Sequence, residues 1–119
     1  MKYIITENKL EQVIIQFLNK KYGELEEYRR ESMPNSIYFL KDGKVYIEYD
    51  ILERVPIIGY DEIWKVLENL FSLKYEQIQS ILDKWLEYRF NLKGRFPRPG
   101  NSMFWQNAEK DYEFKKNNK

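Results

Sequence analysis

The chain has 119 residues, of which 43% are hydrophobic, 17% aromatic and 33% charged, and it contains neither histidine nor cysteine. This composition is typical of one globular domain with a single core, and it excludes a wholly disordered chain. The missing residue types exclude Ser-His-Asp triads, Cys-His dyads, disulfides and the usual zinc sites. Only carboxylate, Lys, Tyr or Ser chemistry is left for an enzyme.

The formal net charge of +1 is unevenly distributed along the chain. Residues 1–88 carry 12 basic and 16 acidic side chains, whereas residues 89–119 carry 8 basic and 3 acidic ones. No apolar run has the length of a signal peptide core or of a membrane span. We therefore expect a soluble, cytoplasmic protein that makes no membrane contact and has an acidic body and a basic tail.

The first element predicted is a helix over residues 7–21. Thr6 is the expected N-cap, and Ile5 is expected to pack onto Leu10 as a hydrophobic staple. Gly23 is expected to adopt the left-handed conformation that commonly ends a helix. The apolar residues follow the i, i+3, i+4, i+7, i+8 spacing of one helical stripe, at Leu10, Val13, Ile14, Phe17 and Leu18.

Two strand regions are predicted next. Residues 24–35 combine heavy charge with weak alternation, which favours an edge strand ended by Pro34-Asn35, with a helical turn as the alternative. Asp42-Gly43 then separates two β-rich segments, residues 37–41 and 44–49. This dipeptide predicts a hairpin, because a type I′ turn needs positive φ at both central residues.

A two-residue turn at this position would pair Leu40 with Val45 and Tyr38 with Ile47. Strand residues alternate between the two faces of a sheet, so this register assigns each residue to a face. The core face is expected to hold Tyr38, Leu40, Val45, Ile47, Tyr49 and Ile51. The other face, with Glu48 exposed, is expected to hold Phe39, Tyr46, Glu48 and Asp50.

Two further helices are predicted at residues 62–71, with Asp61 as N-cap, and at residues 75–90. The link between them is so short that the helices must be neighbours. The inward residues of the first helix are Ile63, Trp64, Leu67, Leu70 and Phe71. Those of the second are Ile78, Ile81, Leu82, Trp85 and Leu86. From Asn91 onward, glycines and prolines indicate an irregular segment.

Together these elements predict an α+β fold. It consists of an N-terminal helix, a small antiparallel sheet around the hairpin, a C-terminal helical pair packed on the sheet, and an irregular basic and aromatic tail. We expect residues 1–92 to form a single globular domain. Residues 93–119 are expected to form a C-terminal arm that is extended or partly docked.

Two short segments, YIITENKL at residues 3–10 and LFSLKYEQI at residues 70–78, together with Trp85, resemble small uncharacterised proteins of tailed phages. The resemblance covers about a quarter of the chain. It implies a viral source and a role outside basic metabolism, in the host cytoplasm or the virion. It supplies no activity and no catalytic residues.

Glu48 and Asp50, which lie beside Tyr46, form the best carboxylate pair for acid–base chemistry, although most surface acids are purely structural. A divalent cation on this pair and Asp61 lacks the ligand spacing of a calcium loop. The five scattered glycines also build no phosphate-binding loop. We therefore predict no metal, no cofactor, no small-molecule substrate and no enzymatic activity.

A helix-turn-helix is a second interpretation of the two adjacent helices. The exposed face of residues 75–90 would then enter the major groove of DNA. That face carries three acidic residues and one lysine, which is the wrong charge for a groove lined by phosphates. A helical hairpin that covers the sheet is the better explanation.

The tail mixes arginines with aromatic residues, and its candidate partner-binding residues are Arg95, Phe96, Arg98, Phe104 and Trp105. This mixture is typical of protein interfaces, and also of segments that stack on bases while contacting phosphates. A third interpretation is that the aromatic residues fold back onto the body. The leading hypothesis is a non-enzymatic interaction or accessory protein that binds a protein partner or its own copies. Nucleic-acid binding through the basic arm is the alternative.

Overall fold

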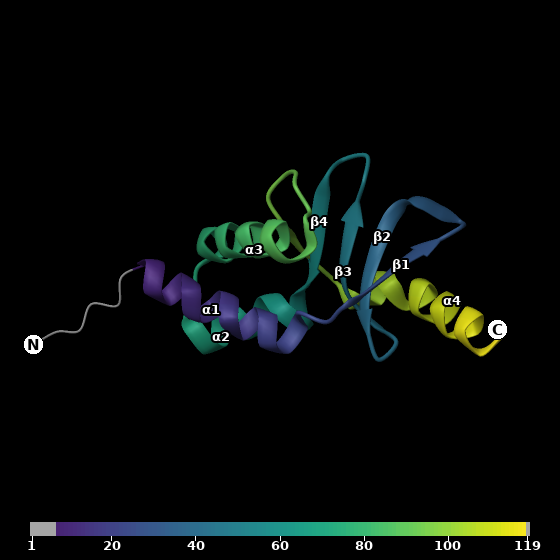
Figure 1. Cartoon of the computed structure of the whole chain (residues 1–119), viewed down its shortest axis with the longest axis horizontal. Coiled ribbons are helices and arrows are strands. Elements are labelled where there is room, and N and C mark those ends of the chain that lie inside the picture. Colours follow the sequence, from purple (N-terminus) through teal and green to yellow (C-terminus); the bar gives the residue numbers. More distant parts are fainter. Residues whose placement is uncertain (1–6, 119) are drawn as a thin grey trace, which may run out of the picture.

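The computed structural model describes residues 7–118 and has an α+β fold. A five-stranded sheet in the order β1-β2-β3-β4-β5 lies between helices α1 to α3 on one side and α4 on the other (Figure 1). All neighbouring strands are antiparallel except β4 and β5. The elements are α1 (Glu7–Tyr22), β1 (Glu26–Arg30), β2 (Met33–Lys41), β3 (Lys44–Asp50), β4 (Val55–Gly59), η1 (Tyr60–Trp64), α2 (Lys65–Phe71), α3 (Tyr75–Phe90), β5 (Arg98–Gly100), η2 (Ser102–Trp105) and α4 (Gln106–Asn117).

Helix α1 confirms the predicted first helix, and Ile14 and Leu18 are fully buried on its inner face. Val13, which was assigned to the same stripe, is exposed. The predicted cap Thr6 and staple residue Ile5 lie outside the described residues. The prediction of a left-handed Gly23 is wrong, because its φ is not positive. Glycine is needed there for another reason: a Cβ would lie 2.2 Å from the Asn19 carbonyl oxygen.

The charged segment after α1 is an edge strand, β1, as predicted. Pro34-Asn35 does not end it, however. The chain turns at residues 31–32, and strand β2 already begins at Met33 and runs through Pro34 and Asn35. Pro34 is tolerated because it lies at the beginning of its strand, where a missing N–H costs little.

The hairpin between β2 and β3 has the predicted turn, since Asp42 and Gly43 have φ values of 54° and 79°. Leu40 pairs with Val45 as predicted, but the predicted pairing of Tyr38 with Ile47 is wrong. A β-bulge leaves Tyr46 as an extra residue, so that Phe39 pairs with Ile47 and Tyr38 with Glu48. Such a bulge breaks the simple alternation of faces.

The sheet has two buried faces instead of the single core face predicted, because helices pack on both sides of it, and the bulge places Val45 and Ile47 on different faces. Ile47 joins Phe39 in the larger core, between the sheet and helices α1 to α3. Val45 joins the smaller core under α4, which contains Tyr38, Leu40, Val45, Trp105 and Ala108. Val45 and Ile47 are both buried as predicted, Phe39 is buried against prediction, and Glu48 is half-buried instead of exposed.

The predicted helical pair is present and packs on the sheet with α1. Its first helix begins earlier than expected, with the π-helical turn η1, so that Asp61 lies inside the helical segment and is not its N-cap. Leu70 is exposed, against prediction. Helix α3 has the predicted bounds, and all five of its predicted inward residues are buried.

The chain beyond Asn91 is more regular than predicted. It forms strand β5, the 3-10 turn η2 and the helix α4, which packs across the face of the sheet opposite α1 to α3 (Figure 1). Among the described residues of α4, Ala108 alone is buried. The apolar residues of this helix are therefore too few for the helix to be recognised from their spacing.

Candidate functional site

The segment that follows α3 is held against the body by hydrogen bonds to its backbone. The Arg95 N–H donates to the Arg54 carbonyl at 2.7 Å. The Tyr49 hydroxyl donates to the carbonyl of Lys93 at 2.6 Å, and the Gln79 amide donates to the carbonyl of Pro97 at 3.0 Å. Because these bonds involve backbone atoms of the segment, they leave its side chains free to face solvent.

Four of the five predicted partner-binding residues are exposed: Arg95, Phe96, Arg98 and Phe104. We call these four residues the arm surface. Phe96 is 60% exposed and Phe104 is 82% exposed. An exposed apolar side chain indicates an interaction surface only where it belongs to a larger apolar patch.

Trp105, the fifth predicted partner-binding residue, does not belong to the arm surface, because it is only 1% exposed and is part of the smaller core. Its indole Nε1 donates to Oε1 of Glu48 at 2.8 Å. The other carboxylate oxygen of Glu48 accepts a hydrogen bond from Ser36 Oγ at 2.8 Å. One oxygen of Glu48 thus attaches the C-terminal segment to the sheet, and the other links β3 to β2.

The other member of the predicted carboxylate pair, Asp50, also makes a local bond. Its Oδ1 accepts a hydrogen bond from the backbone N–H of Glu53 at 3.0 Å and so closes the turn after β3. Among residues 7–118, no group of three or more carboxylates is arranged to hold a metal ion. Glu48 and Asp50 thus bind different partners: Glu48 binds Trp105 and Ser36, and Asp50 binds the backbone of Glu53.

A hollow of about 460 Å³ lies beside the arm surface, where β5 meets the turn after β3. Arg98 and Phe104 line it together with the acidic residues Asp50 and Glu53. Its remaining lining residues are Val55, Ile57, Pro99 and Gly100. Gly100 lets β5 lie close beside β4, because a Cβ there would be 2.3 Å from Cγ2 of Ile57.

The charges around this hollow are nearly balanced. Arg95 pairs with Glu53 at 3.7 Å, in an exposed and therefore weak ion pair. Within the described part of the chain, Arg98 has no ion pair. Its guanidinium, with five N–H donors, is free to bind an acceptor on another molecule.

Helix α4 is attached to the sheet by a row of polar contacts. Glu109 accepts from the N–H of Val45 at 2.8 Å, next to the bulge. Tyr28 donates to Asp111, and Tyr112 donates to Glu26 at 2.7 Å. Burial and the bond to Asp111 raise the pKa of Tyr28 to about 12, and the same bond lowers the pKa of Asp111. Sequence reasoning missed this helix and its contacts.

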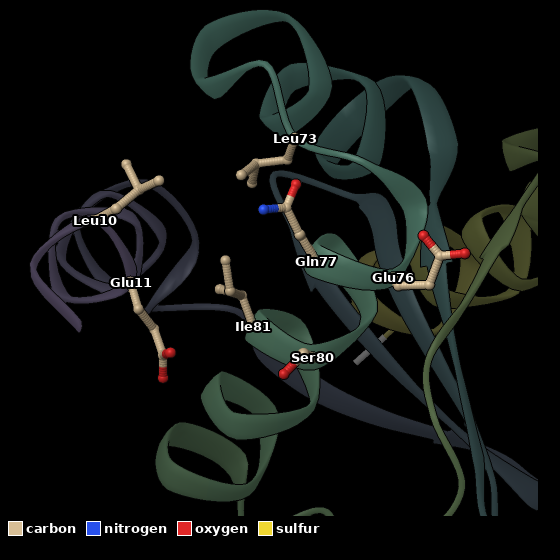
Figure 2. Close-up of a pocket in the computed structure, with 7 residues that line it drawn as sticks. All are labelled: Leu10, Glu11, Leu73, Glu76, Gln77, Ser80 and Ile81. Atoms are coloured by element: carbon tan, nitrogen blue, oxygen red, sulfur yellow. The ribbon is translucent and has the colours of Figure 1, made fainter. Parts of the chain in front are cut away.

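A second hollow, of about 250 Å³, lies between α1 and α3 (Figure 2). Figure 2 shows the apolar side chains of Leu10, Leu73 and Ile81 around the gap between the helices. Glu11, at its rim, is paired with Lys84 at 2.9 Å. No predicted site residue lies here, and the hollow is an ordinary gap between helices.

None of the helices in the described part of the chain is both long and apolar enough to cross a membrane. Comparison of the whole chain with family models, with curated proteins and with solved structures gives no match.

Proposed function

We propose that the protein is a non-enzymatic interaction protein that binds a protein partner through its arm surface. The observation that carries this proposal is the exposure of Phe104 and Arg98 at the edge of a partly apolar hollow. Aromatic residues and arginine are the side chains most enriched in the energetically important centres of protein interfaces.

The hollow also suggests the chemistry of the partner. Val55 and Ile57 can receive an apolar side chain, while Phe104 can cover it. Because Arg98 has no internal ion pair among residues 7–118, an acidic group next to that apolar side chain would complete the contact. We therefore expect the partner to present an apolar anchor with a neighbouring carboxylate.

Nucleic-acid binding is less well supported by this surface. Phosphate recognition depends on an excess of basic side chains, because affinity arises largely from the release of counterions. Here Arg95 and Arg98 face Asp50 and Glu53, so the local charge is close to neutral. Of the other described tail lysines, Lys93 pairs with Glu87 at 3.8 Å. The rest lie on α4, which packs across a different part of the sheet.

The cellular setting belongs to the same proposal. The resemblance of residues 3–10 and 70–78 to tailed-phage proteins supports a phage-encoded accessory or virion component that acts in the host cytoplasm or in the particle.

Selection from a library of random peptides tests the proposal. Peptides enriched on the wild-type chain should contain an apolar residue next to an acidic one. Their affinity should fall at least about tenfold for the F104A and R98A variants, as expected for interface anchors. Phe114→Ala is the matched control, because Phe114 is also exposed but lies on α4.

A titration with a single-stranded oligonucleotide separates the alternative. Tight binding that weakens steeply with salt and survives Phe104→Ala would favour the nucleic-acid interpretation. A selection in which no peptide distinguishes F104A or R98A from F114A would contradict the proposed surface.

A further inference from the structure

Within residues 7–118, strand β1 pairs with β2 on one side and with no strand on the other, so it is an edge of the sheet. Alternate residues of such a strand direct their backbone N–H and C=O groups away from the sheet, where they can pair with another strand. The sequence of β1 is Glu-Glu-Tyr-Arg-Arg. Its charges are therefore antisymmetric about the central Tyr28.

This pattern is complementary to itself when the strand is reversed. An antiparallel copy centred on Tyr28 places Glu26 opposite Arg30 of the copy and Glu27 opposite Arg29 of the copy. The symmetry repeats both pairs, so each of the four charged positions faces an opposite charge. Directly opposed residues of opposite charge stabilise an antiparallel pair, whereas like charges destabilise it.

We propose that β1 binds β1 of a second copy of this chain, forming a two-fold symmetric dimer with a continuous sheet. The proposal concerns a different surface from the arm surface and does not depend on the function proposed above. A two-fold dimer uses the same patch on both subunits, and such a patch must complement itself. The charge order of β1 meets that requirement.

The same charges disfavour other pairings of this edge. A parallel copy in the same register would oppose glutamate to glutamate and arginine to arginine. An uncharged or differently patterned strand would leave the charges unmatched, which is how charged edges usually resist indiscriminate pairing. The edge is therefore selective for its own reversed sequence.

Glu27 and Arg29 are well placed for this role. Their side chains are 54% and 60% exposed, and they form an ion pair at 3.2 Å within the strand. In the dimer, the two pairs would form an alternating group of four charges. On the other side of the strand, Arg30 makes an ion pair at 3.6 Å with Asp111, and its Nε has no hydrogen-bond partner among the described residues.

Helix α4 lies on one side of this edge and must leave room for the second copy. Tyr112 bonds Glu26, whereas Asp111 bonds Tyr28 and pairs with Arg30, and Lys115 lies over the Tyr28 ring. Helix α4 therefore contacts β1 through the side chains of one face only of the strand. A two-fold axis at Tyr28 places the α4 helix of the copy on the same face of the joined sheet, so the two helices must fit next to each other across that axis.

A five-residue edge makes a small interface, so we expect a reversible dimer. Sedimentation measurements from about 1 μM to about 1 mM should show a monomer–dimer equilibrium. Glu27→Arg and Arg29→Glu each convert two cross-strand pairs of opposite charge into pairs of like charge. Each change should weaken the dimer by about tenfold or more.

The decisive measurement is an equimolar mixture of the E27R and R29E variants. In the mixed dimer, the arginine introduced at position 27 of one chain faces the glutamate introduced at position 29 of the other. The remaining pair, Arg29 of the first chain with Glu27 of the second, is native. Association should return to at least the wild-type level, although neither chain retains its internal Glu27–Arg29 pair. Circular-dichroism melting of each variant checks that both chains still fold.

Phe104→Ala supplies the matched control, since it alters the arm surface and should leave the dimer unchanged. A wild-type chain that stays monomeric to about 1 mM would overturn the proposal. The same holds if the two single variants associate as strongly as the wild type, or if their mixture does not recover. None of these outcomes bears on peptide binding at the arm surface, so the two proposals fail separately.

Discussion

Replacing Trp105 with alanine tests how α4 is held on the sheet. Trp105 is fully enclosed, and with Ala108 it supplies the buried apolar surface between the C-terminal segment and β2 and β3. Large-to-small changes of a buried aromatic side chain cost about 3–5 kcal/mol. Domains of this size are stable by about 5–15 kcal/mol, so the change should remove about a fifth or more of the free energy of unfolding.

A milder substitution separates the hydrogen bond from the packing. Trp105→Phe keeps most of the ring but removes the indole N–H, which leaves Oε1 of Glu48 without its partner. An unsatisfied, partly buried acceptor costs about 1–3 kcal/mol. Glu48→Gln should show energetic coupling with Trp105→Phe of at least about 0.5 kcal/mol, because the two residues contact each other.

Urea denaturation followed by circular dichroism measures these free energies. Phe104→Ala is the matched control, because the neighbouring ring is 82% exposed and its removal should change the stability by less than about 0.5 kcal/mol. If Trp105→Ala were as harmless as Phe104→Ala, Trp105 would not be the anchor of α4, and the internal role assigned to it would be wrong.

Three further predictions concern the larger core, the hairpin and the polar contacts of α4. Trp85→Ala should lower the free energy of unfolding, measured by urea denaturation, by about 3–5 kcal/mol, because Trp85 is fully buried and its indole donates to Asn19 at 2.8 Å. A change in melting temperature within experimental error would refute this prediction. Gly43→Ala should lower the free energy of unfolding by at least about 1 kcal/mol, because the φ of Gly43 is +79° and a Cβ would lie 2.4 Å from Oε1 of Glu113. Adding Glu113→Ala to this variant should remove the steric clash and leave the cost of the positive φ. The hydrogen bond from Tyr28 lowers the pKa of Asp111 in the folded chain, so the ionised Asp111 stabilises the fold above the pKa of about 3.9 that it has in the unfolded chain, and this stabilisation is lost as the pH falls through the lowered pKa. Asp111→Asn should therefore make the free energy of unfolding less sensitive to acid. An unchanged decrease of stability at low pH would contradict this role of Asp111.

Helices α1 to α3 and the hairpin turn could be predicted because each depends on local signals. The stripe of α3 needs only the spacing of its five apolar residues, and the turn needs only the tolerance of Asp42 and Gly43 for positive φ. The register of β3 could not be predicted in the same way. Its bulge at Tyr46 depends on which partner covers each face, and that is decided by distant parts of the chain.

For the candidate site, the sequence likewise predicts some residues correctly as exposed and one incorrectly. Arg95, Phe96, Arg98 and Phe104 were identified from composition alone, and the structure leaves them exposed. Trp105 differs from them because the turn η2, which was not predicted, directs it inward just before α4. Its spacing with Ala108 and Tyr112, at i, i+3 and i+7, is the apolar signal of the inner face of α4. That signal is too weak to stand out among the many polar residues around it.

The thin attachment of α4 has a consequence for the motions of the folded chain. Cooperative units with few buried apolar contacts open at a lower free energy than the rest of a protein. Detachment of α4 would uncover Tyr38, Leu40 and Val45 while the larger core stays intact. Amide hydrogens of α4 should then exchange with solvent well before those of α3. The briefly uncovered strand surface would be the part of the molecule most prone to aggregate.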